Sequence, residues 1–558
     1  MKVRRFLTFA GAGLLALGAI VSAPLAAQSI DYGSESPIPS DEALEASEAV
    51  IGEIVVRTGN VFDTDDPAES KVLFRFANRV HRTTRPAVIE DLLLFRSGDL
   101  YSRRILDETE RLLRSKRYLY DAQIRPIHYG GNRVDLEVVT RDVWTLTAGL
   151  GFSRSGGENS TRFEVQESNF LGTGREIIVE RTEDVDRTRE LVAFADRSLG
   201  GTHAQLELWL ANMSDGSLQR LELERPFVSL DARWGSGLFV RVEDRVDPFY
   251  LAGREVDRFR HQRTYAEFYW GRSKGLRNGW TRRLLTGYTY DERQFGNRRV
   301  ESFSRFQPRD RTLSYPWLGF EVIEDRFLET NDLDQLQRTE DFFIGRRFHG
   351  KLGYSPEALG GDQERWVFDS GFSSGHPIGD QRMLLLSGGL TSRWADGQEQ
   401  NLMANLRARF YQRNFGNNLF FVSAEVDATQ QADIETQLLL GGDSGLRGYP
   451  LRYQDGNRRF LVTLEQRFYT DWHLFQLVHV GGAVFFDIGR AWFDGEDPLL
   501  IRGPEYTDKV LKDIGFGLRL SSSRSGQGSM IHLDVAFPLD RDDSISGVQW
   551  LISTKETF

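Results

Sequence analysis

The stretch LMANLRARFY, residues 402–411, alternates between apolar and polar side chains with the two-residue period of a β-strand. All its even-numbered residues are apolar, whereas Asn405, Arg407 and Arg409 lie on the other face. A run of this length approaches the roughly ten residues of a tilted membrane strand, against roughly five or six in soluble sheets. The pattern predicts a strand with one face toward lipid and one toward water.

The same alternation continues from Asp142 to Phe558, for example over residues 204–210 and 420–427. In a bilayer only a closed sheet satisfies the hydrogen bonds of every strand edge. We therefore expect a transmembrane antiparallel β-barrel over residues 142–558. At roughly 25 residues for a strand and its connection, this segment would form about sixteen strands. The alternative, a secreted sandwich or propeller, does not account for so many long runs with a charged face.

The N-terminus has the features of a secretory signal peptide over residues 1–27. Lys2, Arg4 and Arg5 precede an uncharged, mostly apolar run, which ends at the small residues Ala26 and Ala27. A single membrane-spanning helix is the less favoured alternative, because the run is short. Residues 28–49 are acidic and polar, which predicts a disordered tether.

Residues 50–141 are predicted to form a small α+β domain. The run Ile54-Val55-Val56 favours a strand, and Pro86 and Gly98 bound a first helix. A second helix is expected after Ser102, a good N-cap. Two strands joined by the turn at residues 130–132 complete the order strand, helix, helix, strand, strand.

Composition excludes several classes of protein. The chain of 558 residues has no cysteine, so disulfides, thiolate metal sites and cysteine nucleophiles are excluded. Its net charge of −11 argues against nucleic-acid binding. Nine scattered histidines show no ligand spacing, and we expect no metal and no cofactor.

Two serine motifs resemble hydrolase signatures, at residues 371–375 (G-F-S-S-G) and 442–445 (G-D-S-G). The first lacks the helix that a lipase nucleophile needs after it, and the second needs a histidine and an aspartate that sequence cannot place. We interpret both as turns or loops and expect no enzyme and no catalytic residue.

The most specific stretch is GGDSGLRGYP, residues 441–450. Four strands are predicted after this stretch. In each of them the apolar side chains form the outer face, so the charged side chains of the opposite face point into the barrel. These are Glu465, Arg467, Asp487, Arg519 and Asp534. An arginine of a loop folded inward, Arg447, would find carboxylates there. From alternation alone, an ordinary water-filled pore with luminal charges is the favoured explanation of these residues.

The motif Leu446-Arg447-Gly448-Tyr449 resembles the arginine-glycine-aromatic motif in the sixth extracellular loop of the BamA/TamA outer-membrane assembly superfamily. The surrounding motifs resemble that family in order and spacing, and the 50–141 domain resembles one POTRA, a polypeptide-transport-associated domain. They are residues 167–174 (ESNFLGTG), 465–467 (EQR), 486–489 (FDIG), 515–519 (GFGLR) and 534–538 (DVAFP).

The resemblance implies a sixteen-stranded barrel in the outer membrane of a Gram-negative bacterium with a POTRA in the periplasm. It implies that Arg447 holds the loop in the lumen against Asp487, with Glu465 nearby. It also implies a weakly closed seam between first and last strands, where client strands pair, or pair on the POTRA edge. The final strand, with Trp550, Ile552 and Phe558 sharing parity, resembles the signal read by barrel-assembly machinery. One POTRA is fewer than the two, three or five of the known branches.

We therefore expect a factor for outer-membrane protein insertion or protein translocation. Its expected partners are outer-membrane lipid, unfolded client proteins and a periplasmic protein or lipoprotein bound through the POTRA, with no nucleic acid. The alternatives are a passive outer-membrane pore or structural surface barrel and, third, a barrel hydrolase.

Overall fold

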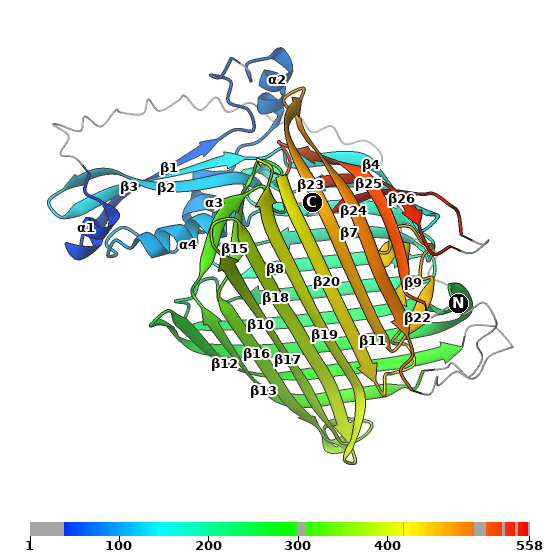
Figure 1. Ribbon diagram of the computed structural model, residues 1–558. Helices are drawn as coiled ribbons and strands as arrows, with labels where there is room; N and C mark the ends of the chain where they lie inside the picture. Colours follow the sequence, from blue (N-terminus) through cyan, green and yellow to red (C-terminus); the bar gives the residue numbers. More distant parts are fainter. Residues whose placement is uncertain are drawn as a thin grey trace, which may run out of the picture.

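The computed structural model describes residues 38–67, 69–297, 308–416, 418–495, 509–526, 530–541 and 545–555. The predicted signal peptide, residues 28–37 of the predicted tether, and Phe558 lie outside them. The described chain forms one large closed antiparallel barrel with a small α+β domain packed at one end (Figure 1). We call this end of the barrel the domain end and the opposite one the far end.

The barrel wall contains twenty strands in the described residues, and each pairs with the strand before and after it in the wall. The strands are β4 Leu146–Ser155, β5 Glu158–Glu167, β6 Arg175–Glu183, β7 Thr188–Asp196, β8 Gln205–Met213, β9 Gly216–Arg225, β10 Trp234–Leu251, β11 Arg254–Arg277, β12 Trp280–Asn297, β13 Arg311–Glu324, β16 Arg346–Ser355, β17 Arg365–Ile378, β18 Arg382–Ala395, β19 Gln398–Asn414, β20 Asn418–Gln430, β23 Arg458–Leu474, β24 Val478–Trp492, β25 Leu511–Ser522, β26 Met530–Pro538 and β27 Gln549–Lys555.

The prediction of about sixteen strands is therefore wrong. The prediction assumed too many residues for a strand and its connection, because several neighbouring strands are joined by only two residues. Asn278-Gly279 joins β11 to β12, and Asp396-Gly397 joins β18 to β19. All four residues have positive φ, the geometry of the tight hairpin turn that matches strand twist. Shorter connections leave sequence for four more strands.

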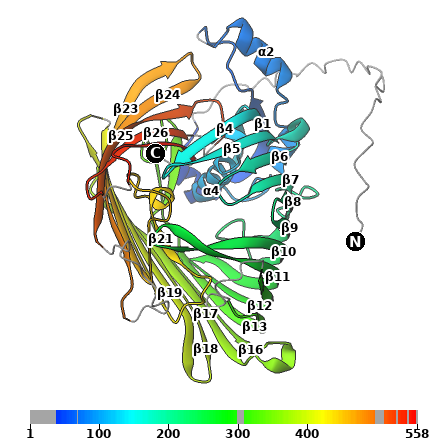
Figure 2. The same cartoon turned by 90° about the vertical axis from the view of Figure 1, so that its right-hand side faces the viewer.

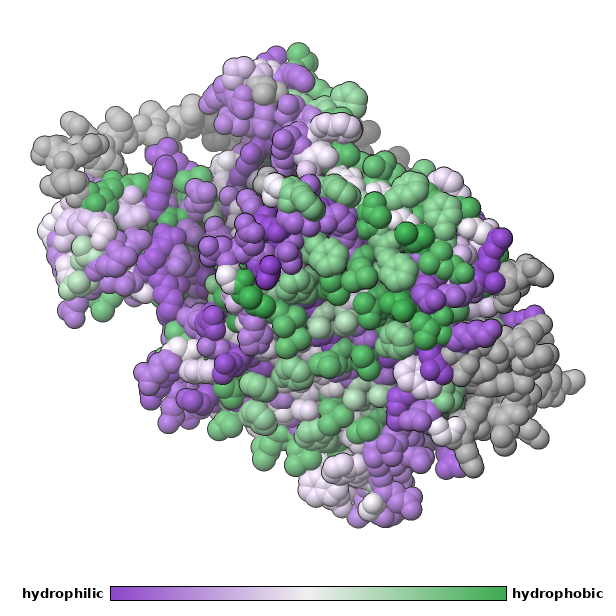
Figure 3. Space-filling model, viewed as in Figure 1, coloured by the Kyte–Doolittle hydropathy of each residue, from purple (hydrophilic) through white to green (hydrophobic). Residues whose placement is uncertain are grey.

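The two faces of the last strands differ as their alternation predicts. On β25, Phe516 and Leu518 are exposed on the outside of the barrel, whereas Arg519 is buried inside. Figure 3 shows a band of hydrophobic residues across the barrel, with hydrophilic residues toward the α+β domain and toward the far end. An apolar band between polar ends is the surface expected of a membrane barrel.

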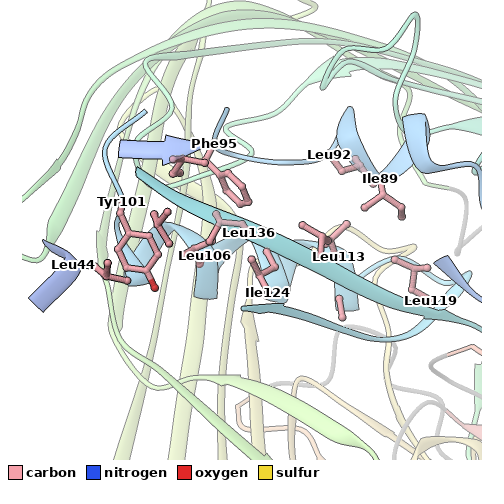
Figure 4. Packing of buried hydrophobic residues seen from close by; sticks show 14 of the residues in the cluster. Leu44, Ile89, Leu92, Phe95, Tyr101, Leu106, Leu113, Leu119, Ile124 and Leu136 are labelled. Carbon is pink, nitrogen blue, oxygen red and sulfur yellow. The ribbon is translucent and has the colours of Figure 1, made fainter. Parts of the chain in front are cut away.

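The α+β domain has a three-stranded sheet in the order β1-β3-β2, in which β1 and β3 are parallel. Apolar side chains of the helices and the sheet form its core (Figure 4). Its elements are α1 Asp41–Ala46, β1 Val50–Gly59, α2 Val72–Val80, α3 Pro86–Glu90, α4 Arg103–Arg114, β2 Leu119–Gly130 and β3 Arg133–Asp142.

Three helices differ from expectation. Residues 41–46, predicted to belong to a disordered tether, form α1, because Ser40 caps the helix and Leu44 is fully buried in the domain core. The prediction missed this helix because the segment is mostly polar and only Leu44 anchors it in the core. Helix α2 was not predicted at all, and the first predicted helix is shortened to α3.

Four short strands lie outside the barrel wall and form two small sheets of their own. They are β14 Phe327–Asn331 and β15 Thr339–Phe343, which pair together, and β21 Leu438–Leu440 and β22 Gln454–Gly456, which pair together. Short 3-10 helices occur at η1 Phe170–Gly172, η3 Glu357–Leu359 and η4 Gly442–Ser444. Among the described residues, no helix has the length and apolar character needed to cross a membrane.

Candidate functional site

The segment between β21 and β22, residues 441–453, folds into the barrel from the far end, and we call it the lumen loop. Figure 2 shows β21 inside the ring of strands. Leu446 and Tyr449 are fully buried in a cluster with Leu461 of β23 and Leu511 of β25. The loop is therefore packed against the inner wall.

Arg447 lies at the centre of the loop's polar contacts. Its guanidinium donates to both carboxylate oxygens of Asp487, at 2.7 and 2.9 Å, and to Glu465 at 2.9 Å. The same group lies 3.3 Å from the ring centroid of Phe485. Arg447 and its two partners are buried. A planar cation with a two-pronged contact to one carboxylate and a ring beneath it is held in a single orientation.

Gly448 and Tyr449 extend the attachment to β25. The Gly448 N–H donates to Asp513 at 2.8 Å, and the Tyr449 hydroxyl donates to the Lys512 carbonyl at 2.9 Å. A Cβ on Gly448 would lie 2.6 Å from the Cβ of Asp513, which is closer than real side chains approach. Glycine is therefore required at this point of contact.

The structure brings all the predicted luminal charges into one network. Arg467 donates to Glu465 at 3.2 Å, Arg519 donates to Asp534, and Arg447 lies 3.7 Å from Asp534. We call these side chains the lumen charge network: Arg447, Glu465, Arg467, Asp487, Arg519 and Asp534. Its members come from the lumen loop and from β23, β24, β25 and β26, so the network joins the loop to four consecutive strands.

A second segment enters the lumen from the domain end, and the sequence did not predict it. Strands β14 and β15 and the turn between them, residues 327–343, form what we call the lumen hairpin. At its tip, Asp334 pairs with Arg467 at 3.2 Å, and the Leu333 carbonyl accepts from the same guanidinium at 2.7 Å. Arg467 therefore links the lumen hairpin to Glu465 and so to the lumen loop.

The lumen hairpin also contacts the α+β domain. Arg114 of α4 donates to Asp341 at 2.7 and 2.8 Å and to Glu329 at 2.9 Å. In turn, Arg338 of the hairpin donates to the carbonyl of Leu119, the first residue of β2, at 3.0 Å. A continuous chain of polar contacts thus runs from α4 through the hairpin to the lumen loop. The only signal in the sequence was two short apolar runs, at residues 327–328 and 342–343.

In the part of the chain that the structure describes, the seam where the sheet closes, between β4 and β27, has the fewest paired positions of any junction in the wall. In the described residues these strands share one paired position, Ile552 with Arg154. Every other pair of neighbouring wall strands shares at least seven; β26 and β27, for example, share seven. Toward the domain end, a cleft of about 650 Å³ separates the two strands. Its lining includes Leu150 and Phe152 of β4 and residues 553–555 of β27.

The remaining predicted residues lie apart from the lumen. Trp550 is exposed on the outer face of β27, and Ile552 is half-buried at the seam. Of the two serine motifs, residues 371–375 lie inside strand β17, so their prediction as a turn is wrong, whereas Ser444 accepts a hydrogen bond from the Gly441 N–H of its own turn. In the described residues, no cluster of histidine, aspartate and glutamate has an arrangement that could hold a metal.

Comparison with known proteins finds similar solved structures. The chain is similar to BamA from Haemophilus ducreyi lacking POTRA domains 1–3, with 14% identity, 91% of this chain and 85% of that chain covered, and a TM-score of 0.39. It is similar to CdiB from Escherichia coli, with 12% identity, 95% and 92% covered, and a TM-score of 0.46.

CdiB from Acinetobacter baumannii gives 11% identity, 92% of this chain and 74% of that chain covered, and a TM-score of 0.41. No protein-family model matches the chain. No curated protein matches it either. At these identities and TM-scores, the likenesses assign no function by themselves.

Proposed function

We propose that this protein lies in the bacterial outer membrane and inserts or translocates other proteins, with client β-strands pairing at the seam between β4 and β27. In this proposal, the α+β domain is a single POTRA in the periplasm, and the domain end of the barrel faces the periplasm. The lumen loop then enters from outside the cell. No covalent chemistry is needed, because the work consists of pairing strands.

The observation that carries the proposal is the seam itself. A strand edge with unpaired N–H and C=O groups is a template for another chain. The cleft opens the edge of β4 toward the domain end, where a client would arrive from the periplasm. Since only one position joins the two strands in the described residues, separating them costs far less than opening any other junction.

The other edge considered for clients, on the α+β domain, is less available at β2. Arg103 and Arg114 donate to the carbonyls of Ile124 and Ala122, and the Ile124 N–H donates to Glu110. These bonds from α4 occupy the outer edge of β2 at its centre. We therefore favour the seam as the place of pairing.

The experiment joins the seam covalently. The chain has no cysteine, so the pair Arg154→Cys and Ile552→Cys introduces one disulfide. Directly opposed residues of antiparallel strands have Cα atoms about 4.5–5.5 Å apart, within the range that a disulfide spans. In cells depleted of the native protein, the joined variant should fail to restore the outer-membrane proteins that depletion removes, and a reductant should restore function.

A matched control joins two strands that are already fully paired, through Leu386→Cys and Ala408→Cys on β18 and β19. This variant should support normal levels of outer-membrane and secreted proteins, measured by quantitative proteomics with transcripts unchanged. Full activity of the seam-joined variant would overturn the proposal. So would a depletion that alters solute uptake but no protein's location, which would indicate a passive pore.

A further inference from the structure

Helix α2 presents an apolar face to the outside of the molecule. Val72, Leu73, Phe76 and Val80 are 75, 66, 60 and 50% exposed. At 3.6 residues per turn these four side chains fall within about 100° of arc, so they form one stripe. Exposed side chains of this size on one stripe mark an interaction surface.

The opposite face of α2 is already packed. Phe74 is buried and stacks on Phe62 with ring centroids 4.3 Å apart, and its cluster includes Leu477 from the turn between β23 and β24. Close by, Arg524, from the segment that follows β25, pairs with Glu69 just before the helix. The helix is therefore fixed to the domain end of the barrel by its buried face. The exposed stripe is not needed for packing in the core of the α+β domain.

The exposed stripe lies next to the outer surface of the barrel. Figure 1 shows α2 beside the tip of the β23–β24 hairpin, in agreement with the contact to Leu477. On that hairpin, Trp472 and Leu474 are exposed and share parity with the outward-facing Phe468, and Phe475 at the turn is 84% exposed. The apolar outer surface of the barrel thus continues onto α2.

Basic residues flank the stripe on one side of the helix and follow its C-terminal end. Lys71, Arg75, Arg79, Arg82 and Arg85 are all exposed, and within the described chain none of them forms an ion pair. No acidic residue occurs between positions 71 and 89, in a protein whose net charge is −11. A basic helix with an apolar face is the pattern of a segment that lies on an anionic membrane surface.

We propose that α2 binds the surface of the membrane that holds the barrel, with its apolar stripe among the acyl chains and its basic residues on anionic phospholipid headgroups. This inference rests on the proposed function in one respect, that the barrel spans a bilayer. The contact of α2 gives the protein a second attachment to the membrane, beside β23 to β26. This attachment restricts the orientation of the α+β domain near the seam.

The experiment uses the full chain folded into vesicles and labelled at one introduced cysteine. Phe76→Cys carries an environment-sensitive nitrobenzoxadiazole dye, and Glu53→Cys, exposed on β1, carries the same dye as control. The vesicles contain phosphatidylethanolamine and phosphatidylglycerol, with or without brominated acyl chains. We expect a blue-shifted emission at position 76 that brominated lipid quenches, and neither effect at position 53.

The charge requirement is tested separately. In phosphatidylcholine vesicles, or with Arg75→Gln and Arg79→Gln combined, the quenching at position 76 should weaken. An unquenched dye at position 76 in a barrel that shows normal heat-resistant migration overturns this inference alone. A shielded dye that lipid does not quench also overturns it and indicates a protein partner or second copy. A chain that does not insert at all overturns both this inference and the proposed function.

Discussion

At the scale of single residues, Arg447 makes the central polar contacts between the lumen loop and the barrel wall. A buried cation is tolerated only when its partners satisfy it, and here one guanidinium serves two carboxylates and lies on Phe485. Without the Arg447 cation, the carboxylates of Asp487 and Glu465 remain buried close to each other and lose the positive charge that compensates them. Lysine restores the charge but not the planar two-pronged contact.

Arg447→Ala should therefore lower the free energy of unfolding by roughly 3–5 kcal/mol. Arg447→Lys should recover only a small part of this loss. Heat-resistant migration on gels and thermal unfolding followed by circular dichroism measure both effects. As a control, Arg407→Ala removes an exposed arginine that lies 3.7 Å from Glu425, and should cost at most about 1 kcal/mol. Equal stability of the Arg447 and Arg407 variants would contradict the role assigned to Arg447.

Glu340 makes the lumen hairpin sensitive to pH. Burial, with the nearby charge of Asp334, raises the pKa of its carboxyl group to about 7, although the backbone N–H groups of Leu333 and Asp334 donate to it. In the unfolded chain the group titrates near 4.5. The folded state therefore holds a proton that the unfolded chain has lost, so this contribution to stability is complete below pH 4.5 and disappears as the pH rises through 7.

We expect the difference in melting temperature between the native chain and Glu340→Gln to change steadily over this pH window, with the native chain losing stability relative to the variant as pH rises. Differential scanning calorimetry at several pH values measures it. A difference that stays constant across the window would show that Glu340 does not change its protonation there.

At the scale of elements, the lumen hairpin connects the α+β domain to the barrel interior. Arg114 of α4 reaches Asp341 and Glu329 on one side of the hairpin, and Arg467 of β23 reaches its tip. The sequence did not reveal this element, because its strands are only five residues long and its partners lie far away in the chain. Arg114 and Asp341, for example, are 227 positions apart.

A double-mutant cycle with Arg114→Ala and Asp341→Ala should give a coupling free energy of roughly 0.5–3 kcal/mol. The pair is largely shielded from solvent, so dissolved salt screens the attraction between the two charges only weakly. Urea unfolding of each variant supplies the four values. The exposed pair Arg181 and Glu190 on neighbouring strands provides the control cycle, with a coupling near zero. Equal couplings in the two cycles would mean that the hairpin is not held by Arg114.

At the scale of the whole molecule, the lumen is occupied from both ends. The lumen loop enters from the far end and packs on β23 and β25, whereas the lumen hairpin enters from the domain end and places Leu336 beside Ala483 and Met530. A twenty-stranded wall would enclose a wide channel if these segments were absent. Their presence favours a barrel that works at its seam over one that conducts solutes through its centre.

Replacing residues 327–343 with a short glycine-serine connection should therefore increase ion conductance in planar bilayers well above that of the native chain. The matched variant replaces Asp380 and Gln381, two exposed residues in the connection between β17 and β18, with glycine and serine and should not change conductance. High conductance of the native protein, unchanged by the deletion, would contradict the closed lumen and support a passive pore.

Alternation along the chain by itself determined which side chains face lipid and which face the lumen, because strand geometry points successive residues to opposite sides whatever the rest of the fold does. It therefore identified Glu465, Asp487 and Arg519 as luminal before any contact was known. Only the tertiary structure decided the number of strands, which depends on connections of two residues, and the entry of the lumen hairpin. It also decided the closure at the seam, where the described residues share a single paired position, and the exposed stripe of α2. The entry of the lumen hairpin, the closure at the seam and the exposure of the α2 stripe depend on contacts between segments distant in sequence, which no local pattern encodes.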